Sequence, residues 1–206
     1  MKILIISLAF LLTLIGNFLL ASSHTNLEGE NSKKFESAVK FVADQKYVEA
    51  VKEFKVLAEA GLPEAQFNLA ILNLNGLGTP KNFKEALYWS WYAHLNAHES
   101  ALNQVDEIYS QINEALRDNV ANAIIEELLL LANAGDRIAA LNLGRTYMQL
   151  LVVPDYQSSY VWLSIAQAYG LEGVGNLLQT ATKQLSLEQV LEQQEKAAET
   201  FAQINP

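Results

Sequence analysis

An internal repeat restricts the fold of this chain more than any other feature of its sequence. Residues 65–80 and residues 139–154 align at an offset of 74, and the offset becomes 73 after the two prolines because the second copy is one residue shorter. Identical aligned residues include Ala65 and Ala139, Asn68 and Asn142, Leu69 and Leu143, Pro80 and Pro154, and Trp89 and Trp162. Repetition at a long, fixed period predicts stacked supersecondary units, which more often form a binding surface than a catalytic pocket.

Two equivalent sets of helices are expected from this repeat. Almost everything from Lys33 onward predicts helix, because the chain holds only 4 prolines and 10 glycines and its apolar residues recur three and four positions apart. A helical hairpin at 33–63 precedes a first four-helix unit at 64–135 and a second at 136–206. The expected helices of the two units are 64–75, 83–96, 99–111 and 114–134, then 137–150, 155–169, 172–184 and 187–203. The predicted fold is an all-α solenoid of antiparallel helix hairpins.

The first two helices of each unit share a pattern of small, apolar, glycine and aromatic residues. In the first unit it comprises Ala65, Leu69, Ala70, Gly76, Gly78, Phe83, Ala86, Trp89 and Ala93. In the second it comprises Ala139, Leu143, Gly144, Tyr147, Asp155, Tyr156, Trp162, Ala166 and Gly170. This pattern resembles the Sel1-like repeat, a relative of the tetratricopeptide repeat. The resemblance implies an adaptor or scaffold that holds other proteins on the concave face of a superhelix.

Departures from the family pattern occur in helices and loops alike. Asn73 stands where the pattern has tyrosine, and Ala97 stands where it has glycine. In the second unit Leu150 and Val152 replace both loop glycines. We therefore expect the loop between the two repeat helices to be built differently in the second unit.

The first 23 residues carry the pattern of a secretory signal peptide. Lys2 precedes an apolar stretch over residues 3–20, and small residues then lead to a cut ahead of His24. The alternative is an uncleaved membrane anchor, because the apolar stretch is close to the length that spans a bilayer. A polar, flexible lead-in is expected over residues 24–32. The prediction is an exported protein, periplasmic or extracellular.

The charge balance limits the choice of partner. The chain has 14 Lys and Arg residues against 23 Asp and Glu residues, which gives a formal net charge of −9. Such a surface repels phosphate backbones and anionic lipid surfaces, so nucleic acid is not an expected partner. The absence of cysteine excludes disulfides and thiolate metal sites. We expect a protein or peptide partner, no cofactor, and contact with a membrane only if residues 1–23 are kept as an anchor.

Few residues offer catalytic or metal-binding chemistry. His94 and His98 are four positions apart beside Glu99, a spacing that can place two imidazoles over a metal on one helical face. The competing interpretation, which we favour, is that His98 lies past the end of its helix and no metal site forms. No nucleophile motif or phosphate-binding glycine loop is present, and carboxylates such as Glu126 and Glu127 are typical of solvated faces. We therefore expect no enzymatic activity.

The long helix at 114–134 is unusually apolar. Ile124, Ile125 and residues 128–131 form a run that is too short and too interrupted by charge to span a membrane. We expect this helix to be the buried spine that joins the two units. A homodimer seam is the alternative.

Polar residues at repeated positions predict one surface for a partner. Asn68 and Asn142 are equivalent in the two copies, and with three further polar residues they predict a hydrogen-bonding ladder for an extended peptide along the concave groove. These three are Asn75, Arg145 and Gln149. Plain solvent exposure of the same residues is the alternative.

An aromatic run gives a second candidate surface. Tyr88, Trp91 and Tyr92 share a helical face with Leu95, and aromatic-rich patches are enriched at binding hot spots. Packing of this face against the helix at 99–111 is an equally good interpretation.

The sequence thus predicts an exported, non-catalytic module that binds a peptide or protein in its concave groove. One alternative is a cell-envelope enzyme acting on wall or glycan substrates, which would need a buried carboxylate with a raised pKa in a deep pocket. The other is a membrane-tethered assembly factor, which would keep residues 1–23 attached.

Overall fold

The helices expected in both units are present in the computed structural model, which describes residues 25–205. They are α2 (Thr25–Ala43), α3 (Tyr47–Glu59), α4 (Pro63–Asn75), α5 (Phe83–Leu95), α6 (Ala101–Tyr109), α7 (Glu114–Asn133), α8 (Arg137–Gln149), α9 (Tyr156–Ala168), α10 (Val174–Thr182) and α11 (Leu187–Ile204). Predicted and observed bounds of α4 to α11 differ by at most two residues. The predicted signal peptide at 1–23 and His24 lie outside the described residues. Within 25–205, none of the helices combines the length and the hydropathy needed to cross a membrane.

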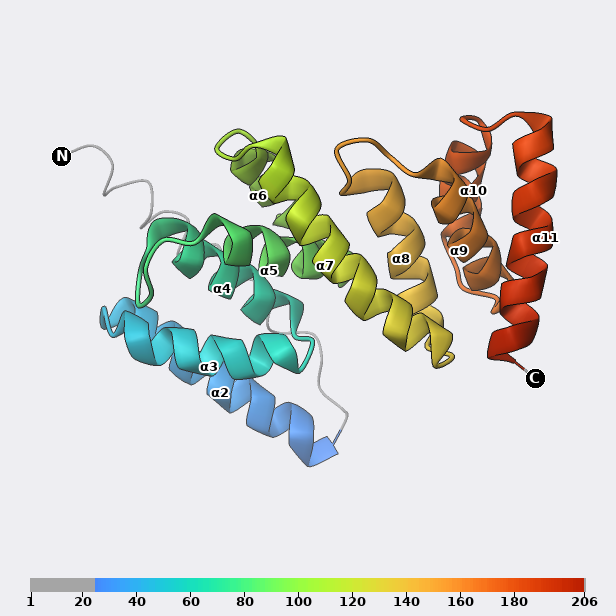
Figure 1. Cartoon of the computed structure of the whole chain (residues 1–206). Coiled ribbons are helices and arrows are strands. Elements are labelled where there is room, and N and C mark those ends of the chain that lie inside the picture. The colour runs from blue at the N-terminus through green and yellow to red at the C-terminus, as the bar shows by residue number, and fades with distance from the viewer. Residues whose placement is uncertain (1–24, 206) are drawn as a thin grey trace.

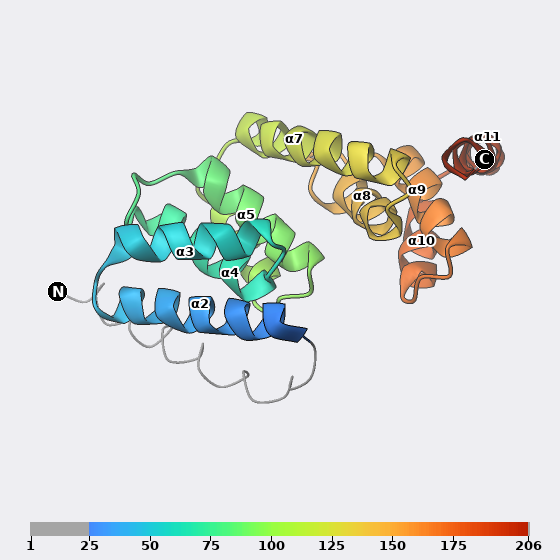
Figure 2. The ribbon, with the colours of Figure 1, turned by 90° about the horizontal axis from the view of Figure 1, so that it is seen from below.

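Each helix packs on helices one or two places away along the chain, so that α2 and α11 lie at opposite ends of the molecule (Figure 1). The contacts run from α2 to α3, from α3 to α4 and from α4 to α5. The long helix α7 packs on both α5 and α8 and so joins the first repeat to the second, as Figure 2 shows from below. At the far end, α10 and α11 both pack on α9. The molecule is a solenoid of sequential helix hairpins, as predicted.

The first helix begins earlier than the sequence predicted. Residues 25–32, expected as a flexible lead-in, belong to α2. An ion pair of 2.8 Å between Lys34 Nζ and Glu30 Oε1, one helical turn apart, accompanies this extension. Further along the helix, the Phe35 ring meets the Phe54 ring of α3 edge to face, with centroids 5.7 Å apart. Helix α2, the first described helix, therefore extends the solenoid by packing on α3.

The structural repeat extends further back than the predicted unit boundaries at 64 and 136. Helices α3 and α7 end in the same way, since Gly61 and Gly135 take positive φ angles of 87° and 91°. In both, the N–H just past the glycine donates to the carbonyl five residues earlier, at 3.0 Å. Helix α3 therefore has the same position relative to α4 as α7 has relative to α8. A packed helix precedes each repeat hairpin.

Small residues let the two helices of each repeat cross closely. A Cβ atom on Gly144 of α8 would lie only 2.6 Å from Leu163 Cγ on α9. The first repeat has Ala70 at the equivalent place, and this residue is fully buried. Trp89 and Trp162 are also buried at equivalent positions, where they fill the space between neighbouring hairpins.

Helix α7 has a buried face and an exposed face. Ile124 and Leu128 belong to the large hydrophobic cluster that extends from α4 to α11. Leu130 and Leu131 lie on the other face and are 75% and 49% exposed. The prediction that this helix is a buried spine between the units is therefore confirmed for one face.

Glycine builds the loop between α4 and α5. Gly76 ends α4 in the left-handed conformation, with φ at 68°, and Gly78 also has a positive φ, at 73°. A Cβ atom on Gly78 would collide with the backbone carbonyl of Tyr47, because the loop lies directly against the start of α3. Asn82 then begins α5, and its side-chain oxygen accepts a hydrogen bond from Glu85 N at 3.2 Å.

The loop between α8 and α9 has no glycine and is held by α7 instead. The Arg117 guanidinium donates to the carbonyl oxygens of Gln149, Leu150 and Leu151 at 3.1, 2.7 and 3.0 Å. The carboxylate of Asp118 accepts from Val152 N at 2.9 Å. The prediction of a differently built second loop is confirmed, and two charged side chains of a preceding helix make the difference.

Candidate functional site

A groove with a volume of about 350 Å³ lies where the first repeat meets the second. The end of α3, together with α4 and α5, forms one side of it, and α7 with the first turns of α8 forms the other. We call it the α5–α7 groove, because α5 supplies its aromatic side chains and α7 supplies Glu127, Leu128 and Leu131 opposite them. Residues from both repeats meet there, so the groove depends on the stacking of the two units.

Three aromatic rings of α5 line one wall of the groove. The ring centroid of Tyr88 lies 4.9 Å from that of Trp89 and 4.9 Å from that of Tyr92. Trp89 and Tyr92 are 6.4 Å apart by the same measure. The indole Nε1 of Trp89 donates to Glu85 Oε2 on the same helix at 3.1 Å. The wall is therefore a rigid aromatic surface of a kind that is common at protein-binding hot spots.

Glu127 connects this wall to α7. The hydroxyl groups of Tyr88 and Tyr92 both donate to its Oε2 atom, at 2.7 and 2.8 Å. Burial raises the pKa of both phenols, and the hydrogen bonds to Glu127 raise it further. Both hydroxyl groups therefore stay protonated and keep the carboxylate in one orientation at the edge of the rings.

Amide side chains line the groove between its two sides. Gln66 Nε2 donates to the carbonyl of Ala58 at 3.1 Å, and Asn96 Nδ2 donates to Gln66 Oε1 at 2.9 Å. Asn142 is only 6% exposed and also lines the groove. Among the described residues its side-chain amide has no hydrogen-bond partner. A nearly buried amide facing the groove is therefore open to a ligand.

The mouth of the groove combines acidic and apolar side chains. Asp136 caps α8, and its Oδ1 accepts from Ile138 N and Ala139 N at 2.8 and 2.9 Å. The side chains of Leu131 and Ile138 line the same rim and are 49% and 54% exposed. Exposed apolar side chains beside a hollow are typical of interaction surfaces.

Three of the eight residues predicted to contact a partner line the α5–α7 groove, namely Tyr88, Tyr92 and Asn142. Asn68 and Asn75 do not. Both side chains bond to their own helix instead, since Asn68 Nδ2 donates to Glu64 O at 2.7 Å and Asn75 Nδ2 to Ile71 O at 2.8 Å. The described residues therefore form no polar ladder that continues from one repeat to the next.

Arg145 bonds to the end of a neighbouring helix and lies outside the groove. Its guanidinium donates to the carbonyl oxygens of Leu95 and His94 at 3.1 and 3.4 Å, and it lies 3.1 Å from the His94 ring. Burial lowers the pKa of Arg145. The side chain thus satisfies carbonyl groups at the end of α5, where a helix has no internal donors left.

Trp91 and Gln149 also lie outside the groove. Trp91 is 1% exposed, and its Nε1 donates to Thr146 Oγ1 of α8 at 3.0 Å. It packs in the large core, so the predicted aromatic face divides into a buried tryptophan and two groove tyrosines. Gln149 is exposed at the end of α8, and its carbonyl accepts from Arg117 at 3.1 Å.

The two central histidines have separate surroundings. His94 contacts Arg145, and burial together with that guanidinium lowers its pKa. His98 lies past the end of α5, where its ring stacks on Phe67 with centroids 4.0 Å apart. Its Nδ1 accepts from Ser100 N at 3.3 Å. Within residues 25–205 no group of three His, Asp or Glu side chains is placed to hold a metal ion.

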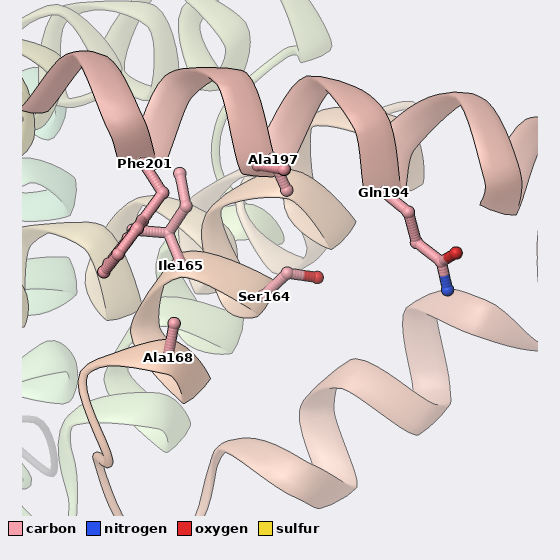
Figure 3. A pocket seen from close by; sticks show the side chains of 7 residues that line it. Ser164, Ile165, Ala168, Gln194, Ala197 and Phe201 are labelled. Carbon is pink, nitrogen blue, oxygen red and sulfur yellow. The ribbon is translucent and has the colours of Figure 1, made fainter.

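A second hollow, of about 250 Å³, lies between α9 and α11 (Figure 3). It occupies the place in the second repeat that the α5–α7 groove occupies in the first. Ile165 there is equivalent to Tyr92, and Ala197 and Phe201 of α11 face it. Ser164 and Gln194 are its polar residues, and no carboxylate lines it. The second hollow is therefore an apolar counterpart of the first.

Fold and groove together define a helical repeat protein with a groove between its repeats. The family model of the Sel1 repeat matches residues 63–90 and 137–166. The chain therefore contains two Sel1 repeats, as predicted, and repeats of this family are protein-interaction modules. The matched segments cover α4 with most of α5, and α8 with most of α9.

One solved structure similar to this chain is the crystal structure of a protective antigen present in uropathogenic Escherichia coli strains, described as displaying an SLR fold. The two chains share 20% identity with a TM-score of 0.37, and the match covers 86% of this chain and 48% of the antigen. This chain therefore spans about half the length of that protein. No curated protein matches the sequence.

Proposed function

We propose that the chain is a non-catalytic protein-interaction module that binds an extended segment of another protein in the α5–α7 groove. The observation that carries this proposal is the side chain of Asn142, nearly buried in the groove wall and without a hydrogen-bond partner among the described residues. An extended peptide offers backbone donors and acceptors that an amide side chain can bind. The aromatic wall beside it supplies apolar contact area for the same ligand.

The carboxylates of the groove favour binding over catalysis. A glycan-cleaving enzyme needs a carboxylic acid whose pKa is raised by burial, so that it can protonate a leaving group. Glu59, Glu127 and Asp136, which line the groove, are all exposed. Asp136 also serves as the cap of α8. These environments suit a rim that contacts a partner, and the envelope-enzyme alternative has no comparable support.

We also propose that the module acts outside the cytoplasm. The support is the N-terminal sequence, in which Lys2, the apolar stretch at 3–20 and the small residues before His24 follow the order of a secretory signal. A chain without cysteine is compatible with an oxidising compartment.

Site-specific photo-crosslinking tests the groove directly. The photoreactive residue p-benzoyl-phenylalanine would replace Leu131, which lines the groove, or its neighbour Leu130, which is exposed but does not line it. Both variants would be produced as the full chain in its own host. We expect crosslinks to discrete proteins from position 131 and far fewer from position 130. Equal crosslinking at both positions, or none at either, would contradict a binding role for the groove.

A further inference from the structure

The α5–α7 groove is acidic, and its charge is largely uncompensated. Its lining includes the carboxylates of Glu59, Glu127 and Asp136 and no lysine, arginine or histidine. Glu59 lies 3.9 Å from Lys55, while Glu127 and Asp136 have no ion-pair partner among the described residues. The whole chain has a net charge of −9. A positively charged ligand is therefore favoured over a neutral or negative one.

Glu127 is held in place with one oxygen still free. Both tyrosine hydroxyl groups donate to Oε2, and within the described residues Oε1 accepts no hydrogen bond. The residue is exposed at the edge of the groove. A carboxylate oriented in this way can accept a charge-assisted hydrogen bond from a guanidinium or an ammonium group without a further loss of side-chain freedom.

The aromatic rings beside Glu127 suit the same kind of group. Tyr88 and Tyr92 line the groove next to the carboxylate, and a cation placed over such rings is attracted by their π electrons. The cation–ring contacts of the described residues are at Phe83 and Tyr109, away from the groove. No cation of residues 25–205 therefore lies over the groove tyrosines, and a guanidinium would stack on them particularly well.

Asn142 and the rim indicate what else the ligand carries. The amide of Asn142, which none of residues 25–205 pairs by a side-chain hydrogen bond, fits the backbone of an extended chain. Leu131 and Ile138 form an apolar rim next to the acidic groups, which fits an aliphatic side chain. A metal ion or a simple cation would leave the apolar rim unused, and an acidic peptide would be repelled.

We propose that the occupant of the α5–α7 groove is a basic segment of a partner protein. An arginine or lysine of that segment lies over Tyr88 and Tyr92 and bonds to Glu127, and a neighbouring aliphatic residue packs on Leu131 and Ile138. This inference rests on the proposed function of the groove and adds the chemical class of the ligand.

Selection from a library of randomised octapeptides displayed on phage, with the purified protein as bait, tests the inference without a known partner. We expect peptides enriched in arginine or lysine beside leucine or isoleucine. Selected peptides would then be titrated against wild type, against Glu127→Gln and against Glu126→Gln. The side-chain oxygen of glutamine can still accept hydrogen bonds from both tyrosine hydroxyl groups. Glu127→Gln therefore removes the negative charge without disturbing the aromatic wall. Glu126 is exposed and does not line the groove, which makes it the matched control.

The expected result is an affinity about tenfold weaker for Glu127→Gln and unchanged within twofold for Glu126→Gln, with a marked loss of wild-type binding at high salt. Neutral or acidic selected peptides that bind wild type but not a Leu131→Gln variant would overturn the basic ligand and leave the groove as the binding site. A selection that returns no peptides, or only peptides that bind Leu131→Gln as well as wild type, would overturn the proposed function itself.

Discussion

The two repeats connect their helices through loops of similar course but different chemistry. In the first, Gly76 and Gly78 supply the backbone conformations, and the loop lies against the start of α3. In the second, Arg117 and Asp118 reach over from α7 and bind the backbone of residues 149–152. The first loop needs residues without a Cβ atom. The second loop is held instead by hydrogen bonds from two side chains of α7. A repeat can therefore lose its signature glycines when a neighbouring helix takes over their role.

The largest effect is expected from Gly78→Ala, which tests the first loop. The added Cβ meets the carbonyl of Tyr47, and the positive φ is unfavourable for alanine, so we expect a loss of roughly 3 kcal/mol in the free energy of unfolding. Urea denaturation followed by circular dichroism measures this. The control is Gly175→Ala in α10, where nothing lies within 4 Å of the new Cβ, and stability should stay the same or rise. Equal effects of the two changes would contradict the account of the first loop.

Arg117→Ala should have the next largest effect and tests the second loop. It removes the donors to three carbonyl groups and the contact of the guanidinium with the Tyr109 ring, whose centroid is 4.1 Å away. We expect a loss of about 2 kcal/mol in unfolding free energy. Hydrogen exchange should also accelerate at residues 150–155. Arg137→Ala, at an exposed arginine without a hydrogen bond among the described residues, is the control and should cost little.

Gly144→Ala tests whether the helix crossing of the second repeat needs a glycine. The first repeat has Ala70 where the second has Gly144, and a Cβ at Gly144 would lie 2.6 Å from Leu163 Cγ. We expect Gly144→Ala to lower the unfolding free energy by about 1.5 kcal/mol because the second hairpin has no space for the methyl group. A stabilising effect, as for an ordinary helical glycine, would show that α9 can move aside. The melting temperature of the variant decides between these outcomes.

Asp118→Ala is expected to have a smaller effect on the second loop. It leaves Val152 N without its 2.9 Å acceptor and should cost about 1 kcal/mol. Asp118→Asn keeps an acceptor oxygen and should retain most of the stability. If both variants lose equally, the charge of Asp118 is the important property and the hydrogen bond is secondary.

The two repeats should also differ in their response to acid. Burial and the Arg145 guanidinium hold the pKa of His94 below its ordinary value, while the second repeat has the exposed Gln167 at the equivalent position. The unfolded chain therefore takes up the proton first as pH falls, and stability declines from about pH 6.5 down through the lower folded-state pKa. His94→Gln should make the decline in stability shallower. The decline that remains should come from His98, whose pKa is also lowered by burial. Urea midpoints at pH 7.5 and 5.5 measure the slope, and an unchanged slope in His94→Gln would contradict this assignment.

The helices could be predicted from the sequence because their signals are local. Asn82 begins α5 and Gly76 ends α4 through contacts within a few residues, and the internal repeat then placed the same elements in the second unit. The helical start of α2 was missed because polar composition alone favours a flexible segment; the four-residue spacing of Glu30 and Lys34, which suits an ion pair on a helix, was the available signal. The way the second loop is held could not be predicted from local sequence either, because Arg117 lies more than 30 residues before the carbonyl groups that it binds.

The groove was predicted only in part, because equivalent sequence positions have different neighbours. Asn68 and Asn142 match in the repeat, yet only Asn142 lines the groove. Trp91 and Tyr92 are adjacent on one helix, but α8 covers the first and leaves the second facing Glu127. Glu127 was interpreted as a solvated residue, and its position beside an apolar run on α7 was the available signal. Which helix would cover which face could not be determined from periodicity alone.

The contact between Arg117 and the second loop has a consequence for how such modules can be lengthened. In a nearest-neighbour description of a repeat array, the stability of each unit divides into an intrinsic part and a coupling to the unit before it. Because Arg117 and Asp118 of α7 hold the second loop, the free energy that stabilises this loop belongs to the coupling between units. A copy of residues 137–168 grafted onto another array would therefore lack its own loop anchors. The transferable cassette begins with α7 and runs over residues 114–168.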